Sequence, residues 1–147
     1  MPSYSLSFHE LDQEAISLAS GSLQKLAEGL NASFKIMTLR LFEHGKEIFK
    51  MTAETATTQL VIDRPHTDIA HRRRGLATLG VYLALKYGEH KGCTHVKLGT
   101  NSEPDAVPFW TAVGVGTTMA TPITTAIRRI KDAAGSSGST LQIRSAP

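Results

Sequence analysis

The segment from His71 to Thr78 contains the residue types that bind phosphate groups. Three consecutive arginines, Arg72, Arg73 and Arg74, precede Gly75, and the apolar periodicity of a helix begins directly afterwards. The first amides of a helix have no partner within the helix and lie at the positive end of its dipole, so they attract anions. Glycine lets the backbone approach a phosphate closely. The segment therefore predicts a polyphosphate site.

Small side chains continue this pattern into the first helical turn. Ala77 keeps the surroundings of Gly75 open, and Thr78 adds a hydroxyl group that can donate to a phosphate oxygen. A basic segment before a helix is equally typical of a solvated turn, so these residues alone do not distinguish the two interpretations.

The elements around this segment predict a strand, a loop, a helix and a second strand. Gln59 to Asp63 forms a short apolar run that should end at Arg64-Pro65, because proline cannot donate to a central ladder. Helical periodicity then runs from Gly75 to His90, and Thr94 to Gly99 alternates as a strand. A helix between two strands of one sheet implies a parallel crossover, so we expect an α/β or α+β fold.

The flanking regions predict further elements. Tyr4 to His9 could form an edge strand, and Leu11 to Leu30 has a helical apolar stripe that Ser20-Gly21 bends or interrupts. Apolar runs on both sides of His44-Gly45 predict a hairpin of Ser33–Phe42 and Glu47–Glu54.

The C-terminal part predicts two helices and a short last element. The first helix, capped by Ser102, runs to Val113, and the second begins at Thr121-Pro122. The segment from Thr140 to Arg144 is predicted to form a last short strand or a disordered end.

Two motifs together resemble those of the GNAT acetyltransferase superfamily. The spacing Arg-x-x-Gly-x-Ala at Arg72 to Ala77 resembles the family's pyrophosphate motif, Gln/Arg-x-x-Gly-x-Gly/Ala. Downstream, Asn101 and the run Ala106 to Val115 resemble its second signature, in which an asparagine precedes a helix of the form Ala-x-x-Phe-Tyr-x-x-x-Gly-Phe. The motifs have the family's order and separation, and the resemblance covers roughly 59–115.

The resemblance implies one domain over 1–147, with its motif-bearing core at about 59–115 and a C-terminal helix and tail at 120–147. It implies a central mixed, mostly antiparallel sheet, flanked by helices, whose fourth and fifth strands splay apart around acetyl-coenzyme A. The cofactor-binding residues that it implies are Thr67, Ile69, Arg72, Arg73, Arg74, Gly75, Leu76, Ala77, Thr78, Asn101 and Trp110.

The same resemblance implies an N-acetyltransferase in which an amine attacks the thioester directly. An amine with a pKa near 10.4 is almost entirely protonated at neutral pH, so a general base is needed. The candidates are Glu54, Asp63, His66 and Asp68; Asp63 leads because it ends the predicted strand, and His66 is its alternative.

One position departs from the family pattern. Trp110 replaces the tyrosine that commonly protonates the departing thiolate, and an indole N–H is not a usable acid. Tyr82, Tyr87 or a water could substitute. The alternative function is therefore an acyl-coenzyme A-binding or regulatory protein of this fold with little or no transferase activity.

Composition sets limits on partners and location. The net charge of +3 is too small to diagnose nucleic-acid binding, although the face Arg128, Arg129 and Lys131 keeps a basic nucleic-acid- or protein-binding module as a third interpretation. The single cysteine, the missing secretory signal and the short apolar runs favour a soluble, cytoplasmic protein without a membrane span. The histidine spacing predicts no metal site. We expect a small-molecule or protein amine as substrate. The sequence is also compatible with a homodimer.

Overall fold

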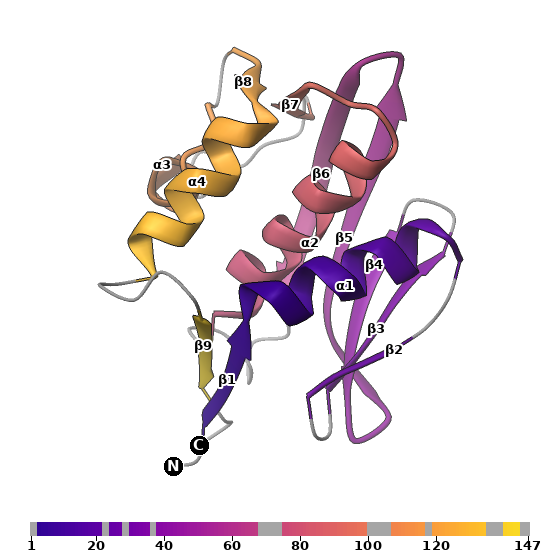
Figure 1. Cartoon of the computed structure of the whole chain (residues 1–147). Coiled ribbons are helices and arrows are strands. Elements are labelled where there is room, and N and C mark those ends of the chain that lie inside the picture. The colour runs from indigo at the N-terminus through magenta and orange to yellow at the C-terminus, as the bar shows by residue number, and fades with distance from the viewer. Residues whose placement is uncertain are drawn as a thin grey trace.

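The computed structural model describes residues 3–21, 24–27, 30–35, 38–67, 75–99, 107–116, 119–134 and 140–144 (Figure 1). Four helices and nine strands are found in this part of the chain. The helices are α1 (Phe8–Ala19), α2 (Leu76–His90), α3 (Val107–Val113) and α4 (Ile123–Ala133). The strands are β1 (Ser3–Ser7), β2 (Gln24–Ala27), β3 (Leu30–Lys35), β4 (Thr38–Glu43), β5 (Lys46–Ala56), β6 (Gln59–Thr67), β7 (His95–Leu98), β8 (Thr121–Pro122) and β9 (Thr140–Arg144).

Seven strands form one mixed sheet in the order β2-β3-β4-β5-β6-β7-β8. All neighbouring strands pair antiparallel except β6 and β7, which pair parallel and are joined through α2. The expected parallel crossover and the expected mixed, mostly antiparallel sheet are both confirmed.

Helices α1 and α2 lie side by side over the strands in Figure 1. Two glycines let α2 approach the sheet closely. A Cβ at Gly80 would lie 2.3 Å from Cε1 of Phe49, and a Cβ at Gly88 would lie 3.0 Å from Cδ2 of Leu60. The absence of a side chain at Gly80 therefore permits the close packing of α2 on Phe49 of β5.

The predicted interruption of the N-terminal helix at Ser20-Gly21 is confirmed, but the expected helical continuation to Leu30 is wrong. Helix α1 begins with a capping box of Ser7 and Glu10 and ends at Ala19, where the chain turns through Gly21 at a φ of +89°. Beyond this turn, Leu26 lies in β2 and Leu30 in β3. Ile16, which belongs to the apolar stripe, is 43% exposed.

Two predicted strand boundaries were also wrong. The run Ser33–Phe42 is divided between β3 and β4, which pair with each other, so its apolar residues belong to two strands. The hairpin of β4 and β5 around His44-Gly45 is confirmed. Strand β6 does not end before Pro65 but continues to Thr67.

Strands β1 and β9 form a separate two-stranded antiparallel ladder, with Ser3 opposite Arg144 and Ser7 opposite Thr140 (Figure 1). The predicted strand at Thr140–Arg144 is confirmed. The expected strand at Tyr4–His9 is confirmed only in part, because Phe8 and His9 already belong to α1.

Helix α4 follows its predicted start and buries the expected apolar face, but its basic residues are not simply solvated. Arg129 donates from Nη1 to the carbonyl oxygen of Gly114 at 2.9 Å, and its side chain lies over the Cα of that glycine. The Nζ of Lys131 lies 5.7 Å from the ring centre of Phe8. Both side chains therefore stabilise the packing of α4 on its neighbours.

Candidate functional site

Strands β6 and β7 separate after four paired residues. The pairs run from Gln59–His95 to Ile62–Leu98, and the amide of Gly99 donates to the carbonyl oxygen of Ile62 at 2.8 Å. Beyond this bond β6 continues to Thr67, whereas β7 ends at Leu98. We call this place, formed by Ile62, Asp63, Leu98 and Gly99, the β6–β7 fork. The parallel pairing thus ends in the region where the splay of two strands is expected, and the splay itself stays a prediction because the chain directly beyond Gly99 lies outside the described residues.

A β-bulge follows directly on the same strand. The register between β5 and β6 shifts after the pair Thr52–Asp63, so that one residue of β5 lies opposite both Arg64 and Pro65. Bulges tolerate proline and are frequent next to active sites, because the extra residue bends the strand and redirects it. The bulge explains why Pro65 does not end β6, and it bends this strand where β7 no longer accompanies it.

Asp63 is the first residue of β6 after its last pair with β7, and its carboxylate lies against Gly99. A Cβ at Gly99 would be 2.7 Å from Cγ and from Oδ1 of Asp63. The side chain of Asp63 is half-buried. The carboxylate thus has a defined position at the fork, and the absence of a side chain at residue 99 makes room for it.

Gly75 is the N-cap of α2, the helix that follows β6 in the chain. No side-chain hydrogen bond is made at this cap, and the φ of Gly75 is +93°. The first intrahelical bond joins the amide of Leu79 to the carbonyl oxygen of Gly75 at 3.0 Å. The amides of Gly75 to Thr78 therefore precede the first helical hydrogen bond, as expected for an anion-binding helix start. Phosphate binding by these amides stays a prediction.

The other predicted site residues have different outcomes. Ile69, Arg72, Arg73, Arg74 and Asn101 lie outside the described residues, as does Asp68. His66 and Thr67 are described only by their backbone, which places them in β6 opposite Lys50 and Phe49. Trp110 lies in α3, is 2% exposed and makes an edge-on contact with Phe109 at 5.0 Å between ring centres. Its predicted place beside a cofactor is untested.

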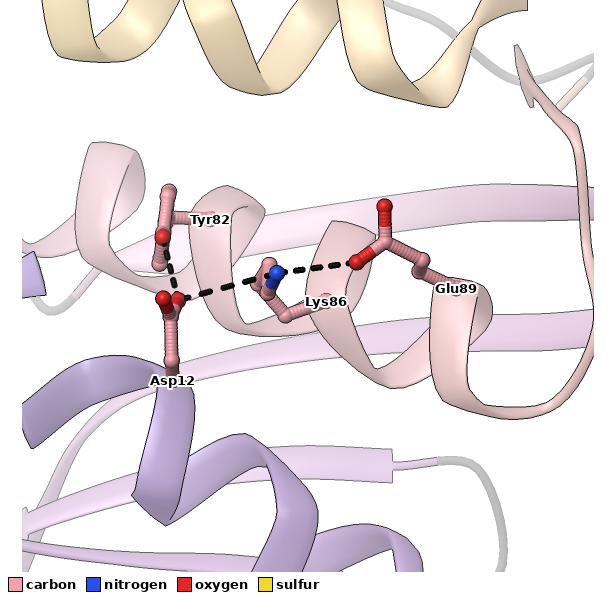
Figure 2. Close-up of polar contacts among 4 residues, drawn as sticks. All are labelled: Asp12, Tyr82, Lys86 and Glu89. Carbon is pink, nitrogen blue, oxygen red and sulfur yellow. Dashed lines mark hydrogen bonds and ion pairs between the residues drawn. The ribbon is translucent and has the colours of Figure 1, made fainter. Parts of the chain in front are cut away.

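A polar network between α1 and α2 was not predicted. Figure 2 shows Asp12 of α1 pointing at Tyr82 and Lys86 of α2. The hydroxyl of Tyr82 donates to Oδ1 of Asp12, and the Nζ of Lys86 lies 3.8 Å from Oδ1 of Asp12 and 2.8 Å from Oε1 of Glu89. The spacing of Tyr82, Lys86 and Glu89 along one helix face was visible in the sequence, but the partner in α1 was not.

This network removes Tyr82 from the candidate acids. Its hydroxyl proton is already donated to a carboxylate, and burial, reinforced by the hydrogen bond to Asp12, raises the pKa of Tyr82. Tyr87 packs its ring on Phe34 at 4.0 Å between ring centres, and burial raises the pKa of Tyr87 as well. A less acidic phenol is a poorer proton donor, so neither tyrosine replaces the missing acid well.

Replacing Tyr82 with phenylalanine is expected to remove part of the loss of stability at alkaline pH. The folded state holds the phenolic proton more tightly than the unfolded state, whose pKa is 10.0. The contribution of Tyr82 is therefore complete below about pH 10 and falls by about 1.4 kcal/mol per pH unit above it. Denaturant unfolding between about pH 9 and about pH 11 measures this slope. Equal slopes for the two proteins would contradict the prediction.

The part of the chain that the structure describes contains no group of three or more His, Cys, Asp or Glu residues placed to hold a metal ion. None of its helices is both long enough and apolar enough to cross a membrane.

The fold matches solved structures although the sequence does not match known families. No protein-family model and no curated protein matches the chain. Ard1 from Thermoplasma volcanium is similar over 100% of both chains, with a TM-score of 0.51 and 13% identity. The ribosomal-protein-S18-alanine N-acetyltransferase from Escherichia coli covers 83% of this chain and 94% of its own, with a TM-score of 0.50 and 15% identity. At identities this low the comparison establishes the fold alone.

Proposed function

Starting from the fold of the GNAT N-acetyltransferases, which this chain has, we propose that the protein transfers an acetyl group from acetyl-coenzyme A to an amine. One observation carries the proposal: within the described residues, β6 continues to Thr67 beyond its last pair with β7, Ile62–Leu98, and the helix that follows it begins at Leu76 with first-turn amides that precede the first helical hydrogen bond. A strand that extends beyond its parallel neighbour and a helix start thus follow one another along the same stretch of chain. A cofactor with an amide-bearing arm and a diphosphate has both kinds of group that these features bind.

The residues of the site fit such a cofactor. The backbone around Thr67 to Ile69 would bond the pantetheine arm, and the amides from Arg73 to Thr78 would hold the pyrophosphate, with Arg72 adding positive charge. Asn101 and Trp110 would flank the arm. Ala77 is a small residue where the diphosphate would approach, since its side chain ends at Cβ, whereas the Cβ position of Gly75 lies against Gln142.

Bound acetyl-coenzyme A would supply an acetyl group activated as a thioester. The chain must supply the neutral amine, because a lysine-like amine is only about one part in 2,500 neutral at pH 7. We assign this proton transfer to Asp63, directly or through a water, because its carboxylate lies at the fork against Gly99. Backbone N–H groups of β6 beyond the fork would stabilise the developing oxyanion, with Pro65 excluded because it has no N–H.

The thiolate of coenzyme A, which is the leaving group, needs little acid catalysis from the protein. A thiol has a pKa of about 8.5, so its thiolate departs tolerably well without a protein acid. Trp110 cannot donate the proton and Tyr82 is bonded to Asp12, so we assign protonation of the thiolate to solvent. General acid catalysis is worth about 10²–10⁴-fold, so we expect a slow enzyme rather than an inactive one.

A thermal shift with acetyl-coenzyme A tests the proposal. Ligand at about 100 times its dissociation constant should stabilise the protein by about 2.7 kcal/mol, or roughly 5–10 °C. Thr78→Glu places a carboxylate in the first turn of α2, where the diphosphate would bind, and should abolish the shift. Thr124→Glu is the matched control, because Thr124 is an exposed threonine in the first turn of α4. A wild-type protein that shows no shift at saturation would refute cofactor binding.

The alternative is a protein that binds the cofactor without transferring its acetyl group. The combination of Trp110 and the engaged Tyr82 favours it over a nucleic-acid-binding module, since Arg129 and Lys131 already have partners within the fold. Release of free thiol in the presence of a panel of amines separates the two. Binding without release above the hydrolysis rate would favour the alternative.

A further inference from the structure

The last described strand lies against the start of α2. A Cβ at Gly75 would be 2.9 Å from the carbonyl oxygen of Gln142 and 3.3 Å from Cδ1 of Ile143. Both contacts come from β9, more than sixty residues later in the chain. The backbone of Gly75 is therefore packed directly against the β1–β9 ladder, and its missing side chain is what allows the approach.

The ladder itself is firmly held. Ile143 is 0% exposed and Leu141 is 8% exposed, so the inner face of β9 belongs to the core. On the outer face, Nε2 of Gln142 donates to Oγ of Ser5, its partner in the register, at 3.2 Å. Buried apolar contacts and a cross-strand hydrogen bond together fix β9 on β1.

The ladder also reaches α2 by a second route. Strand β1 leads without a loop into α1, through the capping box of Ser7 and Glu10. The first residue of α1, Phe8, packs its ring on Tyr82 of α2 at 5.0 Å between ring centres. Helix α2 is thus held at its start by β9 and in its middle by the element that continues β1.

We infer that the β1–β9 ladder is a positioning element of the cofactor site, in which Ile143 and Gln142 hold Gly75 and, through it, the first-turn amides of α2. The inference rests on the proposed function, because these amides are the proposed diphosphate ligands. Hydrogen-bond donors bind an anion tightly only when their geometry is fixed in advance, since ordering them on binding lowers the affinity. Loosening Ile143 should therefore weaken cofactor binding although Ile143 touches no cofactor.

Two substitutions at one residue test this positioning. Ile143→Val removes Cδ1, the side-chain atom nearest to the Cβ position of Gly75, and Ile143→Ala removes more of the contact. Ile123→Val and Ile123→Ala are the matched controls, because Ile123 is equally buried and its amide bonds Thr94, which lies beyond the C-terminal end of α2. Calorimetric titration with coenzyme A, well below the unfolding temperature of every variant, measures the dissociation constant.

The dissociation constant should rise about twofold in Ile143→Val and about fivefold or more in Ile143→Ala, and stay within about 1.5-fold of wild type in both controls. Exchange of the Leu79 amide hydrogen, which bonds the carbonyl oxygen of Gly75, should become faster in the Ile143 variants only. Equal affinities and equal exchange for the Ile143 and Ile123 variants would overturn the positioning role while leaving the proposed function intact. Absence of coenzyme A binding in the wild type would instead refute the proposed function, and the inference with it.

Discussion

Asp63→Asn is expected to lower kcat for acetyl transfer by about 10²–10⁴-fold and to leave the affinity for coenzyme A within about twofold of wild type. The amide has the size of the carboxylate but cannot accept the proton of the attacking amine. Because Asp63 acts on the acceptor in the proposed mechanism and not on the diphosphate, chemistry and cofactor binding should separate. Steady-state kinetics with an amine that the protein acetylates measures kcat, and calorimetric titration with coenzyme A measures the affinity.

Glu54→Gln provides the comparison for this prediction. Glu54 lies on the neighbouring strand β5, opposite Val61, and is exposed. Both substitutions remove one carboxylate charge from the same sheet. An effect of the lost negative charge alone would therefore appear in both variants. A large loss of kcat in Glu54→Gln with little loss in Asp63→Asn would contradict the assignment of Asp63 and return the role to another of the candidate bases.

Gly80→Ala is expected to destabilise the protein by about 2–4 kcal/mol, although replacing glycine with alanine usually stabilises a helix. In the middle of a helix, alanine is normally more favourable than glycine by about 1 kcal/mol. Here the added Cβ would lie 2.3 Å from Cε1 and 2.7 Å from Cζ of Phe49, a ring that is 1% exposed and cannot move without disturbing the core. Denaturant unfolding gives the free energy of both proteins.

Gly88→Ala is the matched control, eight residues later on the same helix. Its added Cβ would meet Cδ2 of Leu60 at 3.0 Å and Cβ and Cδ1 of the same residue at 3.2 Å, which is less severe than the 2.3 Å contact at Gly80 and is relieved by a smaller shift. We expect this variant to stay within about 1 kcal/mol of wild type, because a small strain offsets the gain in helix propensity. Equal stability of Gly80→Ala and wild type would show that α2 can move away from β5.

The sequence by itself determined the central unit of this protein. The order of a strand, a loop, a helix and a second strand, with Gly75 at the helix start and Gly92 just beyond its end, follows from periodicity and turn chemistry within about forty residues. These features are local, so neighbouring residues contain the information that specifies them.

The separation of β6 from β7 was predicted from the family resemblance, but its position was decided by the tertiary structure. Proline normally ends a central strand, yet Pro65 lies in β6 because a bulge with β5 accommodates it where β7 no longer pairs. Likewise, the sequence left open whether Ser20-Gly21 bends or ends the first helix, because Leu26 of β2 and Leu30 of β3 continue the helical spacing by coincidence.

The contacts that position the candidate site join residues far apart in the chain. Tyr82 bonds Asp12 across 70 residues, and Gln142 bonds Ser5 across 137. Periodicity reports which face of an element is buried but not which element covers it, because many partners offer the same apolar surface. The residues capable of chemistry could therefore be named from the sequence, whereas the elements that hold them in place were decided by packing over the whole fold.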